Sequence, residues 1–248
     1  MPAAAGLVSA LYEKNMLIAP RQSLLEGTLI RRYQRFITDI RLDNGEVVIA
    51  HTPNTGSMMQ CAVPGHRVLL SRSNNPSRKL SYTLELVRVK KGWVDVNTHR
   101  ANRIVEEALR QGTIQGLEGW TVHREVRLGK SRIDFMLDQS GRKAYLEVKN
   151  VTLICRPRTA CFPDAVTERG ARHLTELLDA VRNGHRGIVL FLVQRSEAES
   201  FSAADAIDPA YGRHLRTVVQ QGVEARAFKT TCRIPHIRLA RSIPVVLN

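Results

Sequence analysis

"SRIDFMLDQSGRKAYLEVKNVT" (residues 131–152) reads as two buried strands joined by a tight turn, yet charged residues interrupt both strand-like runs. Asp134 lies in the first run, and Glu147 and Lys149 lie in the second. Because side chains alternate along a strand, Glu147 and Lys149 share one face, and Asp134 can converge on them if the strands are neighbours. The stretch therefore predicts two acids and one amine at one edge of a sheet.

A pair of partly buried carboxylates needs a compensating partner, because the two groups repel each other and lose hydration. Mg²⁺ or Mn²⁺ would remove that cost, since these ions prefer oxygen ligands and leave positions for water and a phosphate. Lys149 could then orient an attacking water or offset charge that builds on phosphorus. The competing interpretation is structural: a Glu147–Lys149 ion pair, with Asp134 neutralised by Arg132.

The flanking sequence predicts an α/β domain around these two strands. Helical periodicity is present in residues 97–112, 162–184 and 209–221, and Asp164 is expected to cap the second helix. Strand-like runs occupy residues 120–129, 131–138, 143–151, 186–195 and 223–230. The order of helix, three strands, helix, strand, helix and strand is typical of a mixed central sheet.

Residues upstream of this domain are strand-like and rich in turns. The runs cover residues 26–42, 46–51, 66–73, 80–89 and 93–98, and an Asp-Asn-Gly turn follows the first, whose own sequence is also compatible with a helix. Five short strands favour a small closed barrel, with the oligonucleotide/oligosaccharide-binding (OB) fold as first candidate. We therefore expect an α+β protein of two domains, an OB-like five-stranded barrel (23–97) and an α/β domain (98–248), after a flexible extension (1–22).

The charge balance indicates the kind of partner. The chain of 248 residues has 37 Lys and Arg against 23 Asp and Glu, a net charge of +14. Such an excess favours a polyanion such as nucleic acid, and the competing interpretation is a solvated basic surface without function. The excess is +6 in residues 1–90 and +8 in residues 91–248, so a DNA path that crosses both domains is expected.

The cysteines and the N-terminal segment suggest a reducing compartment. The four cysteines form no CxxC pair and have no histidine at zinc-site spacing, so we expect free thiols in the cytoplasm. The opening segment is too briefly apolar for a membrane span. No small-molecule cofactor is expected.

The pattern of Asp on one strand followed by Glu-x-Lys on the next resembles the PD-(D/E)xK nuclease superfamily. The whole chain from about Leu25 is similar to the sugar fermentation stimulation protein A family, through stretches such as "HTPNTGSM", "VNTHRANRIVEEAL" and "FPDAVTERGARHLTEL". The resemblance implies an OB-like domain joined to a restriction-endonuclease-like domain, DNA binding without strong sequence preference, and a suggested regulatory link to maltose metabolism.

The resemblance also assigns roles to residues. Asp134 and Glu147 match the metal-binding carboxylates, and Lys149 matches the catalytic lysine. Glu107 is the expected match for a further catalytic acid, although Glu106 is adjacent. Ile133 stands where the superfamily has proline.

Other polar residues are candidates for DNA contact. They are Arg31, Arg32 and Arg35, the loop residues Asn54 and Thr55, Arg132, and the helical residues Arg169 and His173. For each the competing interpretation is a solvated surface or an ordinary turn.

Two function classes follow from the sequence. The first is a DNA-binding protein with a Mg²⁺- or Mn²⁺-dependent phosphodiesterase site, and the second is a non-catalytic DNA-binding regulator on an inherited nuclease scaffold. An oligosaccharide-binding module is a third, more distant interpretation that rests only on the barrel and the family's name.

Overall fold

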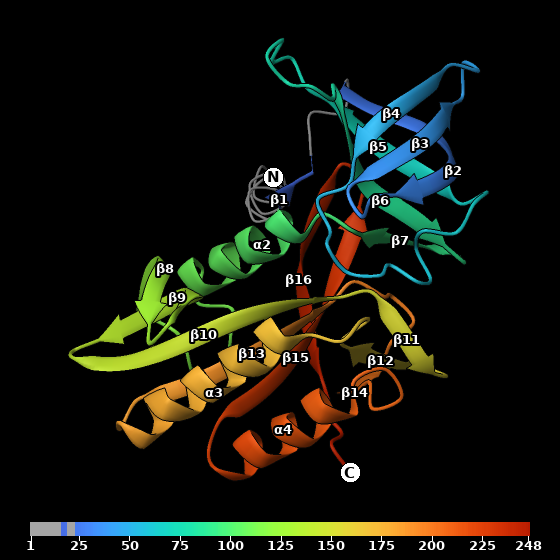
Figure 1. Cartoon of the computed structure of the whole chain (residues 1–248). Coiled ribbons are helices and arrows are strands. Elements are labelled where there is room, and N and C mark those ends of the chain that lie inside the picture. Colours follow the sequence, from blue (N-terminus) through green and yellow to red (C-terminus); the bar gives the residue numbers. More distant parts are fainter. Residues whose placement is uncertain (1–15, 19–22) are drawn as a thin grey trace, which may run out of the picture.

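The computed structural model describes residues 16–18 and 23–248, which form a β-barrel and an α/β domain (Figure 1). The barrel stands over one end of the α/β domain, and the chain passes from one to the other into helix α2. No helix in the described ranges is long and apolar enough to cross a membrane.

The barrel consists of a closed ring of five strands with one strand appended. Its strands are β2 (Leu24–Tyr33), β3 (Ile37–Leu42), β4 (Val47–His51), β5 (Arg67–Arg72), β6 (Tyr82–Val89) and β7 (Gly92–Asp95). The order is β4-β3-β2-β5-β6-β7, and a parallel pairing of β4 with β6 closes the ring. Buried side chains such as Leu29, Ile40 and Leu84 fill it. The expected OB-like barrel is confirmed.

One expected strand of the barrel is in fact two. Residues 26–42 were expected to form a single strand, but Gln34 and Arg35 turn the chain between β2 and β3. Both residues have left-handed backbones, with φ of 50° and 63°. Glycine or asparagine usually marks such a turn, and neither is present, which is why the sequence concealed it.

The α/β domain is built on a mixed sheet of seven strands. Its main elements are α2 (Thr98–Arg110), β8 (Thr121–Leu128), β9 (Ser131–Gln139), β10 (Arg142–Val151), α3 (Glu168–Arg182), β13 (Arg186–Val193), α4 (Pro209–Gln220), β15 (Glu224–Arg233) and β16 (His236–Ile243). The sheet order is β1-β16-β15-β13-β10-β9-β8, with β10, β13 and β15 parallel. Helix α2 covers one face of the sheet, and α3 and α4 cover the other. This is the expected architecture.

The first strand of the described residues belongs to the second domain. Strand β1 (Met16–Leu17) pairs with β16, and Ile18 is buried in the core beneath α2. The expected extension of residues 1–22 is therefore anchored at 16–18, while residues 1–15 and 19–22 lie outside the described residues. An edge pairing of two residues is too short to leave a sequence pattern.

A small second sheet was also not expected. Strands β11 (Leu153–Arg156), β12 (Thr159–Phe162) and β14 (Ser200–Ala203) form it in the order β11-β12-β14. Within it Cys155 and Cys161 form a disulfide, with Cα atoms 6.0 Å apart. The expectation of four free thiols is therefore wrong for these two cysteines, because the β11–β12 hairpin brings them together; Cys61 and Cys232 are free.

Helix α3 begins later than expected. Thr167, and not Asp164, is its N-cap, and the Thr167 hydroxyl accepts a hydrogen bond from the backbone N–H of Gly170 at 3.0 Å. The Asp164 carboxylate instead accepts a hydrogen bond from the backbone N–H of Met58 in the barrel, at 2.9 Å. A contact between domains has replaced the expected local one.

Candidate active site

A cavity of about 890 Å³ lies where the two domains meet. Its walls come from the barrel loop after β4, helix α2, strands β8 to β10 and the segment before α3. Eight of the residues singled out from the sequence line it: Arg32, Arg35, Asn54, Thr55, Asp134, Glu147, Lys149 and Arg169. Residues that the sequence did not single out also line it, among them Asn102, Arg103, Arg124, Glu125 and Asn150.

The two strands that carry the acids separate at the cavity floor. Antiparallel pairing of β9 with β10 ends at Phe135↔Leu146, whereas pairing of β10 with β13 continues to Val151. In the gap, Oδ2 of Asp134 accepts a hydrogen bond from the backbone N–H of Val148 at 2.8 Å. Oε2 of Glu147 lies 3.4 Å from the backbone nitrogen of Asp134. Each carboxylate thus occupies a place that a ladder hydrogen bond would have taken, and the two acids face each other.

The two acids differ in their electrostatic state. Burial, and then the neighbouring Glu147 carboxylate, raise the pKa of Asp134 to about 7. Burial opposes ionisation of Glu147 as well, but Lys149 and His173 outweigh it and lower the pKa of Glu147 to about 2. Burial and mutual repulsion oppose the ionisation of both acids at once. A divalent cation bound between them would stabilise the fully ionised pair.

Lys149 and His173 hold the Glu147 carboxylate. Nζ of Lys149 donates to Oε1 of Glu147 at 2.8 Å, and Nδ1 of His173 contacts the same oxygen. With the proton on Nδ1, the ring donates to Glu147 and its Nε2 accepts from Nε of Arg169 at 3.4 Å, while Nζ of Lys149 lies 3.3 Å from Nδ1 without a hydrogen bond to it. His173 is only 3% exposed, so the structure places it behind Glu147 and not on a DNA-facing surface.

Helix α2 contributes an amide to the site in place of the expected acid. Nδ2 of Asn102 donates to Oδ1 of Asp134 at 2.6 Å. Glu107 does not line the cavity and accepts from Gln111, while Glu106 pairs with two arginines. Asn102, which the sequence did not single out, thus lies about one turn closer to the start of α2 than Glu106 and Glu107. Nothing in the sequence pattern of α2 distinguishes it.

Two of the predicted DNA-contact arginines lie outside the cavity. The Arg31 side chain is exposed, pairs with Asp39 at 2.7 Å and lies over the Tyr33 ring. Arg132 is exposed, with Glu125 at 3.7 Å. The Arg132–Asp134 pairing of the structural interpretation is absent from the ion pairs of the described residues, whereas the Glu147–Lys149 pairing is present.

Arg32 shapes the barrel loop that forms one wall of the cavity. Its guanidinium donates to the backbone oxygens of Arg35, Asn54, Gly56 and Ser57 at distances of 2.6 to 2.9 Å. Arg32 therefore holds the loop in place, and Arg35 and Thr55 are the exposed members of this wall.

The same loop joins the two domains at Asp164. Besides the Met58 contact, Ser57 donates its hydroxyl to the Asp164 backbone oxygen at 2.5 Å. A Cβ added at Gly56 would lie 2.6 Å from Oδ1 of Asp164, so a larger residue fits there only if the Asp164 carboxylate moves. The cavity wall therefore depends on this close approach.

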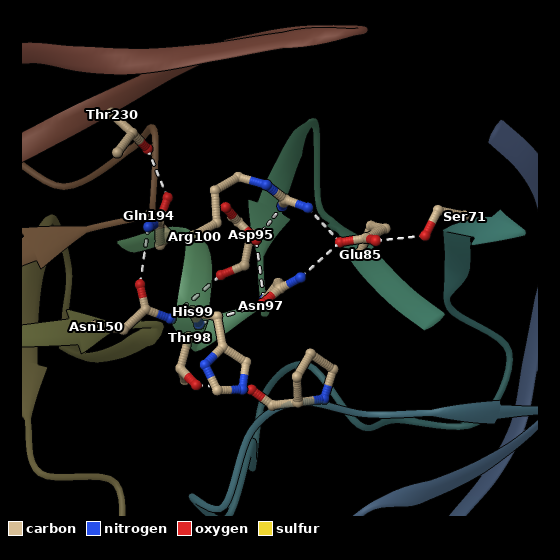
Figure 2. A network of polar contacts seen from close by, with 11 residues as sticks. Ser71, Glu85, Asp95, Asn97, Thr98, His99, Arg100, Asn150, Gln194 and Thr230 are labelled. Carbon is tan, nitrogen blue, oxygen red and sulfur yellow. Dashed lines mark hydrogen bonds and ion pairs between the residues drawn. The ribbon is translucent and has the colours of Figure 1, made fainter. Parts of the chain in front are cut away.

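A buried ion-pair network connects the barrel to helix α2 at the junction of the two domains (Figure 2). Arg100 on α2 donates to Asp95 at 2.7 Å and also binds Glu85 of the barrel. Asn97 donates to Glu85 at 2.9 Å. All three charged side chains are almost fully buried, and Oδ2 of Asp95 has no hydrogen-bond partner among the described residues.

The network continues into the central sheet (Figure 2). Asn150, next to Lys149, lies with its amide nitrogen 3.4 Å from the backbone oxygen of Asp95. Gln194 donates to Asn150 at 2.8 Å and accepts from Thr230 at 2.8 Å. Strands β7, β10, β13 and β15 are thereby tied together directly beside the catalytic lysine candidate.

The donors at the cavity floor suit a hard divalent cation. The facing carboxylates of Asp134 and Glu147 are the ligand type that Mg²⁺ and Mn²⁺ prefer, and water or phosphate would complete the coordination. In the part of the chain that the structure describes, no group of three or more His, Cys, Asp or Glu residues is arranged around a metal position.

Comparison with known proteins decides the family. A family model for the sugar fermentation stimulation protein RE domain matches residues 99–234, and a model for the SfsA N-terminal OB domain matches residues 30–96. The chain belongs to the sugar fermentation stimulation protein family. The resemblance to the sugar fermentation stimulation protein A family is thus confirmed.

Members of this family match the chain over most of its length. A sugar fermentation stimulation protein homolog from Syntrophotalea carbinolica is 57% identical over 225 residues, which cover 91% of this chain and 97% of the relative. A homolog from Geobacter sulfurreducens is 51% identical over 232 residues, 93% of this chain and 99% of the relative. The structure of Pyrococcus furiosus SfsA in complex with Ca²⁺ has a TM-score of 0.85 at 24% identity and covers 93% of this chain and 99% of that one, so it shares the fold.

Proposed function

We propose that the chain binds DNA in the cavity between its domains and cleaves a phosphodiester bond there with a divalent cation. The observation that carries this proposal is the facing pair of Asp134 and Glu147, with Lys149 beside it, on the floor of an open cavity. Exposed arginines of both domains surround that floor: Arg35, Arg103, Arg124 and Arg169.

Asp134 and Glu147 would hold the cation, Mg²⁺ or Mn²⁺. Bound there, it would polarise a water and neutralise charge on the phosphate. The Ca²⁺ in the Pyrococcus furiosus relative supports a hard cation as the partner of this fold. Asn102 and His173 would keep the two carboxylates oriented, as hydrogen-bonded partners of metal ligands do.

Lys149 would act on the phosphodiester itself. Its amine lies 2.8 Å from Glu147 and its side chain lines the cavity, so it can reach both a carboxylate and a phosphate oxygen. A positive group in that place stabilises the charge that develops on phosphorus.

The experiment is a cleavage assay on single- and double-stranded DNA with Mg²⁺ or Mn²⁺. Wild-type protein should cleave, and Lys149→Ala should lose about 100-fold or more of the rate. Lys143→Ala removes an exposed lysine from the same strand and should cleave normally. Cleavage that is equal in wild type and Lys149→Ala would rule out the enzymatic proposal.

A non-catalytic DNA-binding regulator is the second candidate, and it would also suit a regulatory link to maltose metabolism. It is favoured by the existing Lys149–Glu147 ion pair, which satisfies the amine without a substrate. DNA affinity should then fall steeply with salt, and Asp134→Ala should bind DNA as wild type does. Binding that needs both Asp134 and a divalent cation would contradict this candidate.

A further inference from the structure

The β8–β9 hairpin carries basic side chains beyond the cavity. Arg127, Lys130 and Arg132 are exposed, and we refer to them as the hairpin ridge. Arg127 lies directly opposite Arg132 in the antiparallel register. Like charges in such a cross-strand pair destabilise a sheet.

The fold offers little compensation for this repulsion. The Arg132 side chain is 70% exposed, and its nearest carboxylate, that of Glu125, is 3.7 Å away. Among the described residues, no carboxylate is within ion-pair distance of Arg127 or Lys130. Arg127 has only a long contact of 3.4 Å to the backbone oxygen of Gly129. An external anion would relieve the repulsion.

The ridge continues from the proposed active site. Arg132 precedes Asp134 by two residues on β9, so both side chains leave the same face of the sheet, about 7 Å apart along the strand. The hairpin turn packs on α3, because the backbone N–H of Lys130 donates to Glu176 at 3.0 Å. Helix α3 also exposes Arg172 one turn after Arg169. Basic side chains are therefore exposed on two elements that also contribute residues to the cavity.

We propose that the hairpin ridge is a phosphate-binding surface that holds the nucleic-acid strand where it leaves the cavity. The partner is the sugar–phosphate backbone, because paired guanidinium groups bind phosphate oxygens and read no base. This inference rests on the proposed function, since it assigns the DNA path on one side of the Asp134–Glu147 pair.

The test compares two double variants that lose the same charge. Arg127→Ala with Arg132→Ala removes the ridge pair. Arg213→Ala with Arg238→Ala removes two exposed arginines from α4 and β16, and β16 lies across the sheet from the hairpin. The measurement is the dissociation constant for a DNA oligonucleotide over a range of salt concentrations.

The logarithm of the dissociation constant should depend less steeply on the logarithm of the salt concentration in the ridge variant than in wild type. The magnitude of that slope should be smaller by about 2, because each lost phosphate contact removes about one unit. The control variant should keep the wild-type slope. Thermal unfolding of the ridge variant should occur at the wild-type temperature or above it, since a repulsive pair is gone, so weaker binding cannot be attributed to misfolding.

Two results would overturn the inference in distinguishable ways. Equal slopes for the two double variants would show that the ridge does not bind the DNA backbone, and would leave the proposed function intact. No salt-dependent binding by wild-type protein would remove the proposed function and the ridge with it.

Discussion

His173 shows how a single buried residue can act on the site without touching a substrate. It contacts Glu147 through one ring nitrogen and Arg169 through the other. We expect His173→Ala to weaken Mn²⁺ binding by about 10- to 100-fold, because a metal-ligating carboxylate loses the partner that orients it. Isothermal titration calorimetry measures this, with His214→Ala on α4 as the control. Unchanged Mn²⁺ affinity would contradict the orienting role.

Asp95 gives a prediction for the pH dependence of stability. Burial raises the pKa of Asp95 to about 6, from an ordinary value of 3.8, so the folded protein holds a proton that the unfolded chain releases. Protonation of Asp95 stabilises the folded protein fully below pH 3.8, and this stabilisation is lost as the pH rises through 6. The free energy of unfolding should therefore fall by about 3 kcal/mol at most over this range.

The matched variant is Asp95→Asn, which cannot titrate. Urea unfolding between pH 4 and pH 7 should show a decline in the free energy of unfolding that is smaller in Asp95→Asn than in wild type. Asp134 titrates in both proteins, so the difference reports on Asp95. Parallel curves for the two proteins would contradict the assigned pKa.

At this scale the sequence predicted the pair of strands at the cavity floor better than the helix α2 beside it. Alternation along β9 and β10 was enough to bring Asp134, Glu147 and Lys149 together. Asn102 reaches Asp134 only because α2 packs on the sheet in one particular rotation, which depends on tertiary contacts that a single helix pattern does not contain. Glu107, chosen from the same helix by resemblance, lies outside the cavity for the same reason.

Among the elements, the barrel loop after β4 connects the two domains most directly. Gly56 is the residue of this loop that lies against the Asp164 carboxylate. A Cβ at Gly56 would meet the Asp164 carboxylate, which is fixed by the Met58 backbone. We expect Gly56→Ala to cost about 1–3 kcal/mol of stability, as overpacking does. Chemical denaturation of four proteins, wild type, Gly56→Ala, Asp164→Ala and the double variant, tests it. The cost of Gly56→Ala should shrink when Asp164 is already Ala, and additive costs would contradict the contact.

The element boundaries that the sequence missed are those set by contacts between domains or by unusual turns. Asp164 has the residue type of a helix cap, but it binds the barrel, and Thr167 caps α3 instead. The strand expected at 26–42 contains a turn at Gln34 and Arg35, which have no turn propensity. The longest helices and the buried strand β13 were predicted, because their periodicity comes from burial in one domain.

For the whole molecule, we expect the buried network around Arg100 to make the two domains unfold together. Among the described residues, Arg100 is the one ion-pair partner of Glu85 in the barrel and of Asp95 at the junction. Arg100→Ala would leave two buried carboxylates without a cation, which typically costs about 3–5 kcal/mol. Differential scanning calorimetry should show one transition for wild type, and a much lower transition temperature for the variant.

A neighbouring arginine provides the control for this prediction. Arg103 lies on the same helix but is exposed, so Arg103→Ala should unfold close to the wild-type temperature. A small effect of Arg100→Ala, equal to that of Arg103→Ala, would mean that the network does not couple the domains.

The pairing of β1 with β16 matters for anyone who wishes to produce the domains separately. The seven-stranded sheet takes its outermost strand from before the barrel, so a fragment that starts after the barrel would lack β1 and the buried Ile18. The bared edge of β16 could then recruit strands from other molecules and promote aggregation. Deleting the barrel and bridging residue 18 to the start of α2 with a short linker would keep that edge covered, and is the sounder way to obtain the α/β domain alone.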